Sequence, residues 1–171
     1  MMYNKKLLYL FCILVISVIS VGYLTNTNIP HNNNLRLLDF KDLTLIFSIN
    51  TAIILMLCIL SITGLSLVFI IKILFTIGFT AKESGINTFT YFSVSLIHGI
   101  FELIALFIVF VISVKHIILI VECLKGKNKK EVIFKFYFSL LKKEIPITII
   151  LLTIGALLEV YVSNRILIFL I

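Results

Sequence analysis

The sequence predicts an all-α fold, a polytopic bundle of about five membrane-spanning helices. Hydrophobic residues make up 61% of the 171 residues and charged residues only 13%, whereas soluble proteins are roughly half hydrophobic and a quarter charged. The apolar residues also gather in runs that reach or exceed the ~20 residues needed to cross a bilayer as a helix. We therefore expect one membrane domain over residues 1–171, without a soluble catalytic domain.

The first apolar run covers residues 7–24 and follows Lys5 and Lys6. Two interpretations are open, a cleaved signal peptide with a weak small-x-small site at residues 20–22, or an uncleaved first span. The length of the run and the poor cleavage site favour a span over about 7–24. Under either interpretation the two Lys residues are expected in the cytoplasm.

A polar stretch over residues 25–42 separates the first two runs. Its Asn residues and Pro30 are typical of a loop. Its few acidic and basic side chains balance one another, so it carries no cytoplasmic retention signal and is predicted on the outer side.

Residues 43–79 are almost continuously apolar. As one helix they would extend about 55 Å, nearly twice the ~30 Å hydrocarbon core. We therefore predict two spans, over about 43–62 and 65–80, with a tight turn in the small and polar residues 61–64.

The fourth apolar run, residues 89–121, is also long for one span, which is predicted over about 89–114. Two arrangements are open. One is a re-entrant or broken half-helix around His98 and Gly99, and the other is a single long tilted helix with Lys115 and His116 near its cytoplasmic end.

Residues 122–144 form the main polar segment, with seven Lys against three Glu. Such an excess of Lys marks a cytoplasmic segment. Within it, residues 131–143 combine a narrow polar stripe with a broad apolar face, which predicts an amphipathic helix lying at the membrane interface. Two roles are open for this helix, contact with anionic lipid or docking of a cytoplasmic partner. The residues expected to make the contact are Phe134, Phe138, Lys135, Lys142 and Lys143.

The last span is predicted over about 145–163, because Glu144 followed by Pro146 is typical of a helix N-terminus. Five spans, with the N-terminus in the cytoplasm and the C-terminus outside, keep the seven Lys residues on the cytoplasmic side. A single span over 43–79 would place them outside.

Four ionisable side chains fall within the apolar runs, and ionisable groups at membrane depth are candidates for function. His98, Glu102 and Glu159 are expected in the outer half of the bilayer, where they form one polar cluster with Gly99, Asn50 and Lys72. Two interpretations are open: a proton- or ligand-linked site, or hydrogen bonds that pin the helices together. For Lys72, a snorkelling side chain or a pair with a Glu is favoured.

Several function classes are excluded or disfavoured. The sequence has no H-E-x-x-H, G-x-S-x-G or P-loop pattern, so we expect no enzymatic activity, no cofactor and no metal. Cys12, Cys58 and Cys123 form no C-x-x-C pair and are expected to be plain apolar side chains. The net charge is +7, but the chain has no folded basic domain outside its apolar runs, so no nucleic-acid partner is expected. The expected partners are the lipid bilayer and other membrane proteins. Whether the chain forms a homo-oligomer is left open.

His98, Gly99, Glu102 and Leu103 follow the pattern HGxxEL, which resembles a signature of the stage II sporulation protein M family. The Glu159 segment that closes the last span resembles the Glu-containing final helix of that family. Asn50 and the Gly64 turn also lie where such proteins carry polar and glycine positions, so the resemblance covers about residues 43–162. The chain departs from the family at Ile97, where Pro is usual, and at Lys72 and Ile73, where Asn-Gly is frequent.

This resemblance implies a non-enzymatic protein of the bacterial plasma membrane, a scaffold or accessory subunit. Shorter members of the family occur beside ABC transporters in the export of peptide bacteriocins and in immunity to them, which implies an ATPase partner. The namesake implies an alternative, a scaffold for peptidoglycan hydrolases during sporulation engulfment. The chain has no sizeable soluble arm to bind such hydrolases, so we favour the transport-associated role. A small transporter or channel that uses the His/Glu cluster is a further alternative.

Overall fold

The described part of the protein is a bundle of helices. The computed structural model describes residues 5–27, 36–125 and 130–170, and these residues form helices and their connections without a β-strand. Five helical stretches among them are long and apolar enough to cross a membrane. The prediction of an all-α, multi-pass membrane protein is therefore confirmed.

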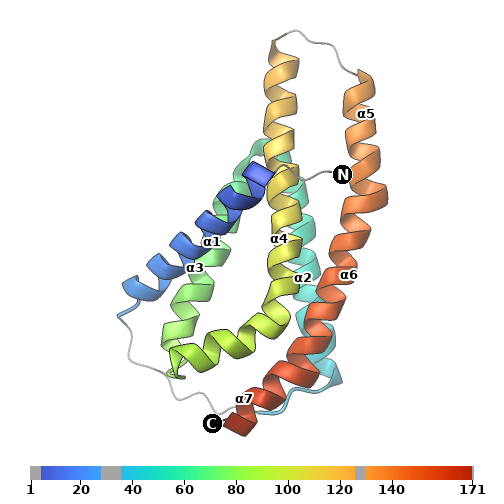
Figure 1. Ribbon diagram of the computed structural model, residues 1–171. Coiled ribbons are helices and arrows are strands. Elements are labelled where there is room, and N and C mark those ends of the chain that lie inside the picture. The colour runs from blue at the N-terminus through green and yellow to red at the C-terminus, as the bar shows by residue number, and fades with distance from the viewer. Residues whose placement is uncertain (1–4, 28–35, 126–129, 171) are drawn as a thin grey trace.

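The helices run alternately down and up the bundle (Figure 1). The upper half holds the start of α1, the turn between α2 and α3, the end of α4 and the start of α5. Two π-helical turns, Leu140–Glu144 and Glu159–Ser163, join the last three helices into one stretch. The helices are α1 (Lys5–Thr25), α2 (Phe40–Leu60), α3 (Leu65–Glu83), α4 (Thr88–Leu124), α5 (Lys130–Ser139), α6 (Ile145–Leu158) and α7 (Asn164–Leu170).

The chain reverses between α2 and α3 in the short segment where the sequence predicts a turn. Residues Ser61–Thr63 form one 3₁₀ turn, and Gly64 follows with φ 78° and ψ −8°. This left-handed conformation strains residues that carry a Cβ, so glycine suits the position. The long apolar run is thus divided into two antiparallel helices.

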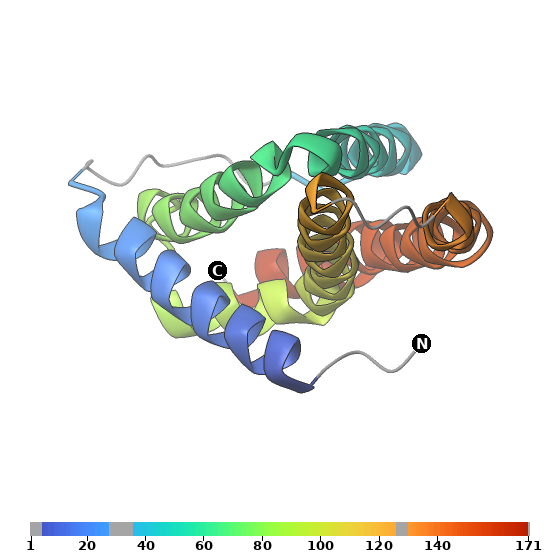
Figure 2. The ribbon, with the colours of Figure 1, turned by 90° about the horizontal axis from the view of Figure 1, so that it is seen from above.

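Helix α4 is one continuous helix of 37 residues, so the single-helix alternative holds and the half-helix broken at His98 and Gly99 is not observed. It runs obliquely through its first turns and then bends upward (Figure 1). Every side chain from residue 105 to 112 is buried, which means that all faces of α4 are packed at this level. Seen from above, α4 lies among the other helices (Figure 2). It also ends at Leu124, ten residues beyond the predicted span of 89–114.

Residues 131–143, which the sequence predicts as an interfacial helix, are helical. Helix α5 continues into α6, so that Glu131–Leu170 is one helical stretch beside α4 (Figure 1). The position of α5 at a membrane interface stays a prediction. No Gly or Pro interrupts residues 130–145. Pro146, which has no N–H, follows a π-turn whose closing bond runs from the N–H of Ile145 to the carbonyl of Leu140. This wider hydrogen-bond pattern lets the helix pass the proline without stopping.

Helices α1 and α3 run side by side with their backbones in direct contact. A Cβ atom added at Gly22 would collide with the backbone oxygen of Phe75, and one added at Gly78 would collide with that of Ile19. Small residues allow membrane helices to approach this closely. At the lower end the Asn26 amide donates a 2.8 Å hydrogen bond to the carbonyl of Phe79, which fastens the end of α1 to α3.

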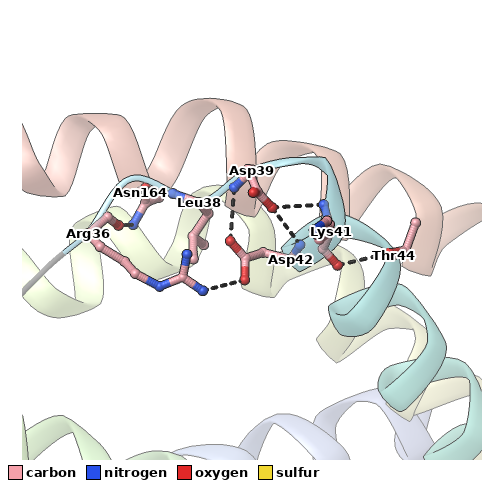
Figure 3. A network of polar contacts seen from close by, with 7 residues as sticks. All are labelled: Arg36, Leu38, Asp39, Lys41, Asp42, Thr44 and Asn164. Carbon is pink, nitrogen blue, oxygen red and sulfur yellow. Dashed lines mark hydrogen bonds and ion pairs between the residues drawn. The ribbon is translucent and has the colours of Figure 1, made fainter.

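The segment before α2 is held from two sides (Figure 3). Asp39 caps α2 by accepting hydrogen bonds from two backbone N–H groups, while the Asp42 carboxylate accepts one from the N–H of Asp39. Asn164, at the start of α7, accepts a 3.0 Å hydrogen bond from the N–H of Leu38 and donates one of 3.2 Å to the carbonyl of Arg36. The start of α7 therefore holds the segment from which α2 begins.

Candidate functional site

A cluster of polar side chains lies between α2, α4 and the end of α6. Asn50 donates a 2.6 Å hydrogen bond to Oε1 of Glu102, and His98 Nδ1 shares one of 3.0 Å with Oγ of Ser163. The side chains of Asn50, His98 and Glu102 are half-buried, and Ser163 is buried. We call Asn50, His98, Glu102, Glu159 and Ser163 the Glu102 cluster.

One face of the last helical stretch supplies the wall opposite α4. Gly155, Glu159 and Ser163 are spaced four residues apart and therefore lie along one helix face. A Cβ at Gly155 would lie 3.4 Å from Cγ of Glu102 and 3.6 Å from the carbonyl oxygen of His98. The absence of a side chain at Gly155 brings this face close enough for the Glu159 and Glu102 carboxyl groups to interact electrostatically. The π-helical turn Glu159–Ser163 lies at this contact, and π-turns are frequent at functional sites.

The structure brings together four of the six residues expected in this cluster. Asn50, His98, Glu102 and Glu159 meet, and Gly99 lies beside them on the wall of a cavity. Lys72 does not join them, because it lies on the exposed side of α3. An exposed Lys on an apolar helix fits the snorkelling interpretation better than membership of the cluster.

A cavity of about 180 Å³ opens beside Glu102. Among the residues that the structure describes, its polar lining consists of Asn50, Ser95 and Glu102 and includes no Lys or Arg. The rest of the wall is apolar and comes from α1, α2, α3, α4 and α6. The apolar lining residues are Ile19, Ile53, Ile54, Ile73, Ile77, Phe92, Leu96, Leu103, Leu106 and Leu152, together with Gly99. Small-molecule sites have this character, an apolar pocket with a few polar groups at fixed positions.

A second set of buried polar contacts lies higher in the bundle. Ser61 Oγ and His116 Nδ1 are 2.7 Å apart, and Ser66 donates a hydrogen bond of 2.7 Å to Ser113. Between this level and Glu102, residues 105–112 form a fully buried apolar layer about 12 Å thick. On α4, the polar contacts of Ser113 and His116 are therefore separated from Glu102 by this apolar stretch.

The C-terminal end of α4 and the N-terminal end of α5 project beyond the turn between α2 and α3 (Figure 1). A Cβ at Gly64 in that turn would lie 3.5 Å from Cδ1 of Ile117, which marks the level of the turn on α4. From Ile117 the helix continues to Leu124, a further rise of about 10 Å. We call residues 117–125 and 130–143 the α4–α5 hairpin.

One face of α5 packs against α4 and another is exposed. The rings of Phe136 and Tyr137 lie 4.7 and 5.4 Å from the ring of the buried His116. On the exposed face, Phe134 and Phe138 stack with their centroids 6.0 Å apart, and Nζ of Lys142 lies 4.2 Å from the centroid of Phe138. We call Phe134, Phe138 and Lys142 the α5 stripe.

Basic side chains accompany the α5 stripe. Lys135 is exposed and lies 3.9 Å from the Glu131 carboxylate, and Lys143 is also exposed. The Lys residues at 127 and 129 lie outside the described residues. All five residues expected to contact lipid or a partner are thus accessible on α5 and the turn after it.

Lys115 on α4 and Glu144 at the end of the π-turn lie at the base of the hairpin. Both line a small cavity of about 30 Å³ and interact electrostatically. Glu144 is buried, with 5% of its surface exposed. A buried carboxyl group beside an ammonium group fixes the register of α5 and α6 against α4, because separating the two would leave a charge without compensation.

Sequence reasoning missed Ser163, Gly155 and the pair of Ser61 with His116. The four-residue spacing of Gly155, Glu159 and Ser163 is a signal that could have revealed the first two. The contact of Ser61 with His116 joins residues 55 positions apart and had no comparable signal. Among the described residues, no group of three or more His, Cys, Asp or Glu lies together in a way that could hold a metal ion.

Comparisons of the chain with protein-family models, with curated proteins and with solved structures gave no match. The resemblance to the stage II sporulation protein M family therefore stays a prediction that rests on the residues given above.

Proposed function

We propose that the protein is a non-enzymatic, multi-pass subunit of a complex in the bacterial cell membrane, and that its α4–α5 hairpin docks a cytoplasmic partner. The observation that carries this proposal is the hairpin itself, which projects past the neighbouring turn and exposes Phe134 and Phe138 beside Lys side chains. Aromatic side chains are enriched at protein interfaces, and charged side chains lie at the rim that surrounds them.

The distribution of charge supports a cytoplasmic position for the hairpin. The described residues of the upper half include a basic set with few acidic neighbours, and the lower end mixes both signs. The positive-inside rule assigns the basic end to the cytoplasm, which leaves the N-terminus inside and the C-terminus outside. The basic set is Lys5, Lys6, Lys115, Lys125, Lys135, Lys142 and Lys143, and the mixed set is Arg36, Asp39, Lys41, Asp42, Lys82, Glu83 and Arg165.

A cytoplasmic docking surface suits one kind of partner better than another. The ATPase of an ABC-type exporter works on the cytoplasmic side, whereas peptidoglycan hydrolases act on the outer side. The hairpin therefore favours a role in export of a peptide or bacteriocin, or in immunity to one, over the role of a sporulation scaffold. This choice rests on the family resemblance together with the side on which the hairpin lies.

Co-purification with changed hairpins tests the proposal. The chain is solubilised from its own membrane and the bound proteins are identified, for the wild type, for Phe134→Ser with Phe138→Ser, and for Lys135→Glu with Lys142→Glu. We expect an ATPase with the wild type and at least a tenfold loss with each double variant. The matched controls are Phe89→Ser and Lys41→Glu, which change exposed residues at the opposite end of the bundle. Full retention of the ATPase by both double variants would sink the docking role.

The same variants separate protein docking from lipid contact. If the hairpin only contacts anionic lipid, the Lys variants weaken the contact of the hairpin with vesicles rich in anionic lipid. Co-purification of the ATPase is then unchanged. If it docks a protein, the Phe variants lose the partner in detergent, where no bilayer surface is present. Hydrogen exchange of the backbone amides of α5, measured in vesicles and in detergent, reports whether lipid or the partner protects this helix.

A small transporter or channel is the second candidate, and the observation that favours it is the Glu102 cluster at the edge of a cavity. The apolar layer over residues 105–112 would have to part for a solute to cross. The purified chain alone in liposomes should then give a pH-dependent flux that His98→Ala and Glu102→Gln abolish. A folded wild type without flux would remove this candidate.

A further inference from the structure

The cavity beside Glu102 combines a largely apolar wall with the carboxyl group of Glu102. We propose that it binds a membrane-soluble amphiphile with a primary ammonium group and a short apolar chain or ring. The apolar walls hold the chain, and the Glu102 carboxyl group, with Glu159 close enough to interact with it, attracts the ammonium group. This site is separate from the α4–α5 hairpin and does not depend on partner docking.

The size of the cavity limits the ligand. Its volume is about 180 Å³, and an apolar protein cavity of about 150 Å³ is large enough to bind benzene. A body of roughly six to eight carbon atoms therefore fits. A complete phospholipid does not, although one end of a longer chain could enter between the helices.

Gly99 supplies the space in the wall. A Cβ atom added at Gly99 would meet no heavy atom within 4 Å, so helix packing does not require a glycine there. Gly22 and Gly78 differ, because a Cβ at either would collide with backbone atoms of the neighbouring helix. A helix-interior glycine costs about 0.5–1 kcal/mol relative to alanine. A ligand bound in the cavity would occupy the open space beside Gly99.

The charge of the site defines the polar end of the ligand. Asn50 occupies Oε1 of Glu102, but a carboxyl group has about four lone-pair sites, so it can accept further donors. No Lys or Arg of the described part of the chain lines the cavity, and Glu159 adds a second carboxyl group close to Glu102. A ligand ammonium group would supply both the donors and the missing positive charge.

A phosphate-bearing head group suits this site less well than a simple amine. The phosphate of phosphatidylethanolamine would bring a negative charge toward the Glu102 carboxyl group of the wall. We therefore assign the site to a simple amine rather than to an aminophospholipid.

Photo-crosslinking of the full chain in detergent tests this assignment. The probe is an eight-carbon primary amine that carries a diazirine near its apolar end, and the comparison probe is the alcohol of the same chain. Crosslinks are mapped by mass spectrometry. We expect the amine to label the cavity segments of α2, α3 and α4 at a concentration at least tenfold below that of the alcohol.

Two variants probe the two ends of the site. Gly99→Leu fills the cavity and should abolish labelling by both probes, whereas Ser93→Leu adds the same side chain to an exposed face of α4 and should leave labelling unchanged. Glu102→Gln keeps the shape and should remove the tenfold preference for the amine while the alcohol still labels. This second variant keeps the test decisive if Gly99→Leu fails to fold.

Three outcomes would overturn the proposal. They are equal labelling by amine and alcohol in the wild type, labelling of Gly99→Leu at the wild-type level, and the absence of cavity labels with both probes. Competition by phosphatidylethanolamine in nanodiscs at the level of the free amine would overturn the assignment to a simple amine.

Discussion

Asn50 of α2 donates a 2.6 Å hydrogen bond to the carboxyl group of Glu102 on α4, although the two residues lie 52 positions apart. The bond sits at the edge of a largely apolar cavity, where few other polar groups compete for either partner. It therefore joins α2 to the central helix and orients Glu102 at the same time.

A double-mutant cycle measures this bond. Asn50→Ala, Glu102→Ala and the double variant are unfolded reversibly in mixed micelles, and the free energies of unfolding are compared. We expect a coupling energy of about 0.5–2 kcal/mol, the range found for hydrogen bonds between membrane helices. Additive single effects would mean that the two side chains do not stabilise one another.

The glycine contacts between α1 and α3 predict a second set of stabilities. Gly22→Ala and Gly78→Ala should each destabilise the fold by about 1–3 kcal/mol or more, because the new Cβ would force the two backbones apart. Gly99→Ala is the matched control, since its Cβ meets open space, and it should raise stability by about 0.5–1 kcal/mol. Equal effects at the three positions would contradict the close approach of α1 and α3.

Cysteine labelling tests the direction of the helices across the membrane. In a variant without Cys12, Cys58 and Cys123, a single cysteine at Arg36 or Gly85 should react with an impermeant reagent added outside intact cells. A single cysteine at Lys125 should react only after the membrane is opened, because the positive-inside rule predicts that the exposed basic end lies in the cytoplasm. Labelling of Arg36 and Lys125 from one side would refute an odd number of spans between them.

The contact of Asn164 with the segment before α2 predicts a change in local dynamics. Asn164→Ala removes the acceptor for the N–H of Leu38 and the donor to the carbonyl of Arg36. The amide of Leu38 should then exchange its hydrogen roughly fivefold faster, as expected for the loss of a bond worth about 1 kcal/mol. Asn164→Asp keeps the acceptor and should give an intermediate rate. An unchanged rate in Asn164→Ala would show that other contacts hold this segment.

Part of the Glu102 cluster was accessible from the sequence. His98, Glu102 and Glu159 stand out because ionisable groups are rare in apolar runs, and a simple depth estimate places them at one level. The same reasoning wrongly added Lys72, because depth alone does not tell which side of α3 faces the bundle. It also missed Ser163, an ordinary polar residue near a helix end that became informative only beside His98.

The path of the helices was less accessible. The pattern of residues 131–143 fits two arrangements equally well. One is an amphipathic helix at a membrane interface, and the other is a helix that packs on a neighbour with one face and exposes the other. In the structure one face of this helix packs on α4, because the rings of Phe136 and Tyr137 lie against the buried His116. The sequence also left two alternatives for α4, a broken helix and a continuous one. The structure shows the continuous helix, and its residues 105–112 are buried on all sides.

The sequence by itself determined that this is an all-α, multi-pass membrane protein with helices in these positions along the chain. Runs of apolar residues of this length satisfy their backbone hydrogen bonds within lipid only as helices, whatever their neighbours are. Only the tertiary structure decided which helices meet, that Asn50 bonds Glu102, and that a cavity remains beside Gly99. These depend on the rotation of each helix about its axis and on contacts between residues more than 50 positions apart, which a local pattern does not encode.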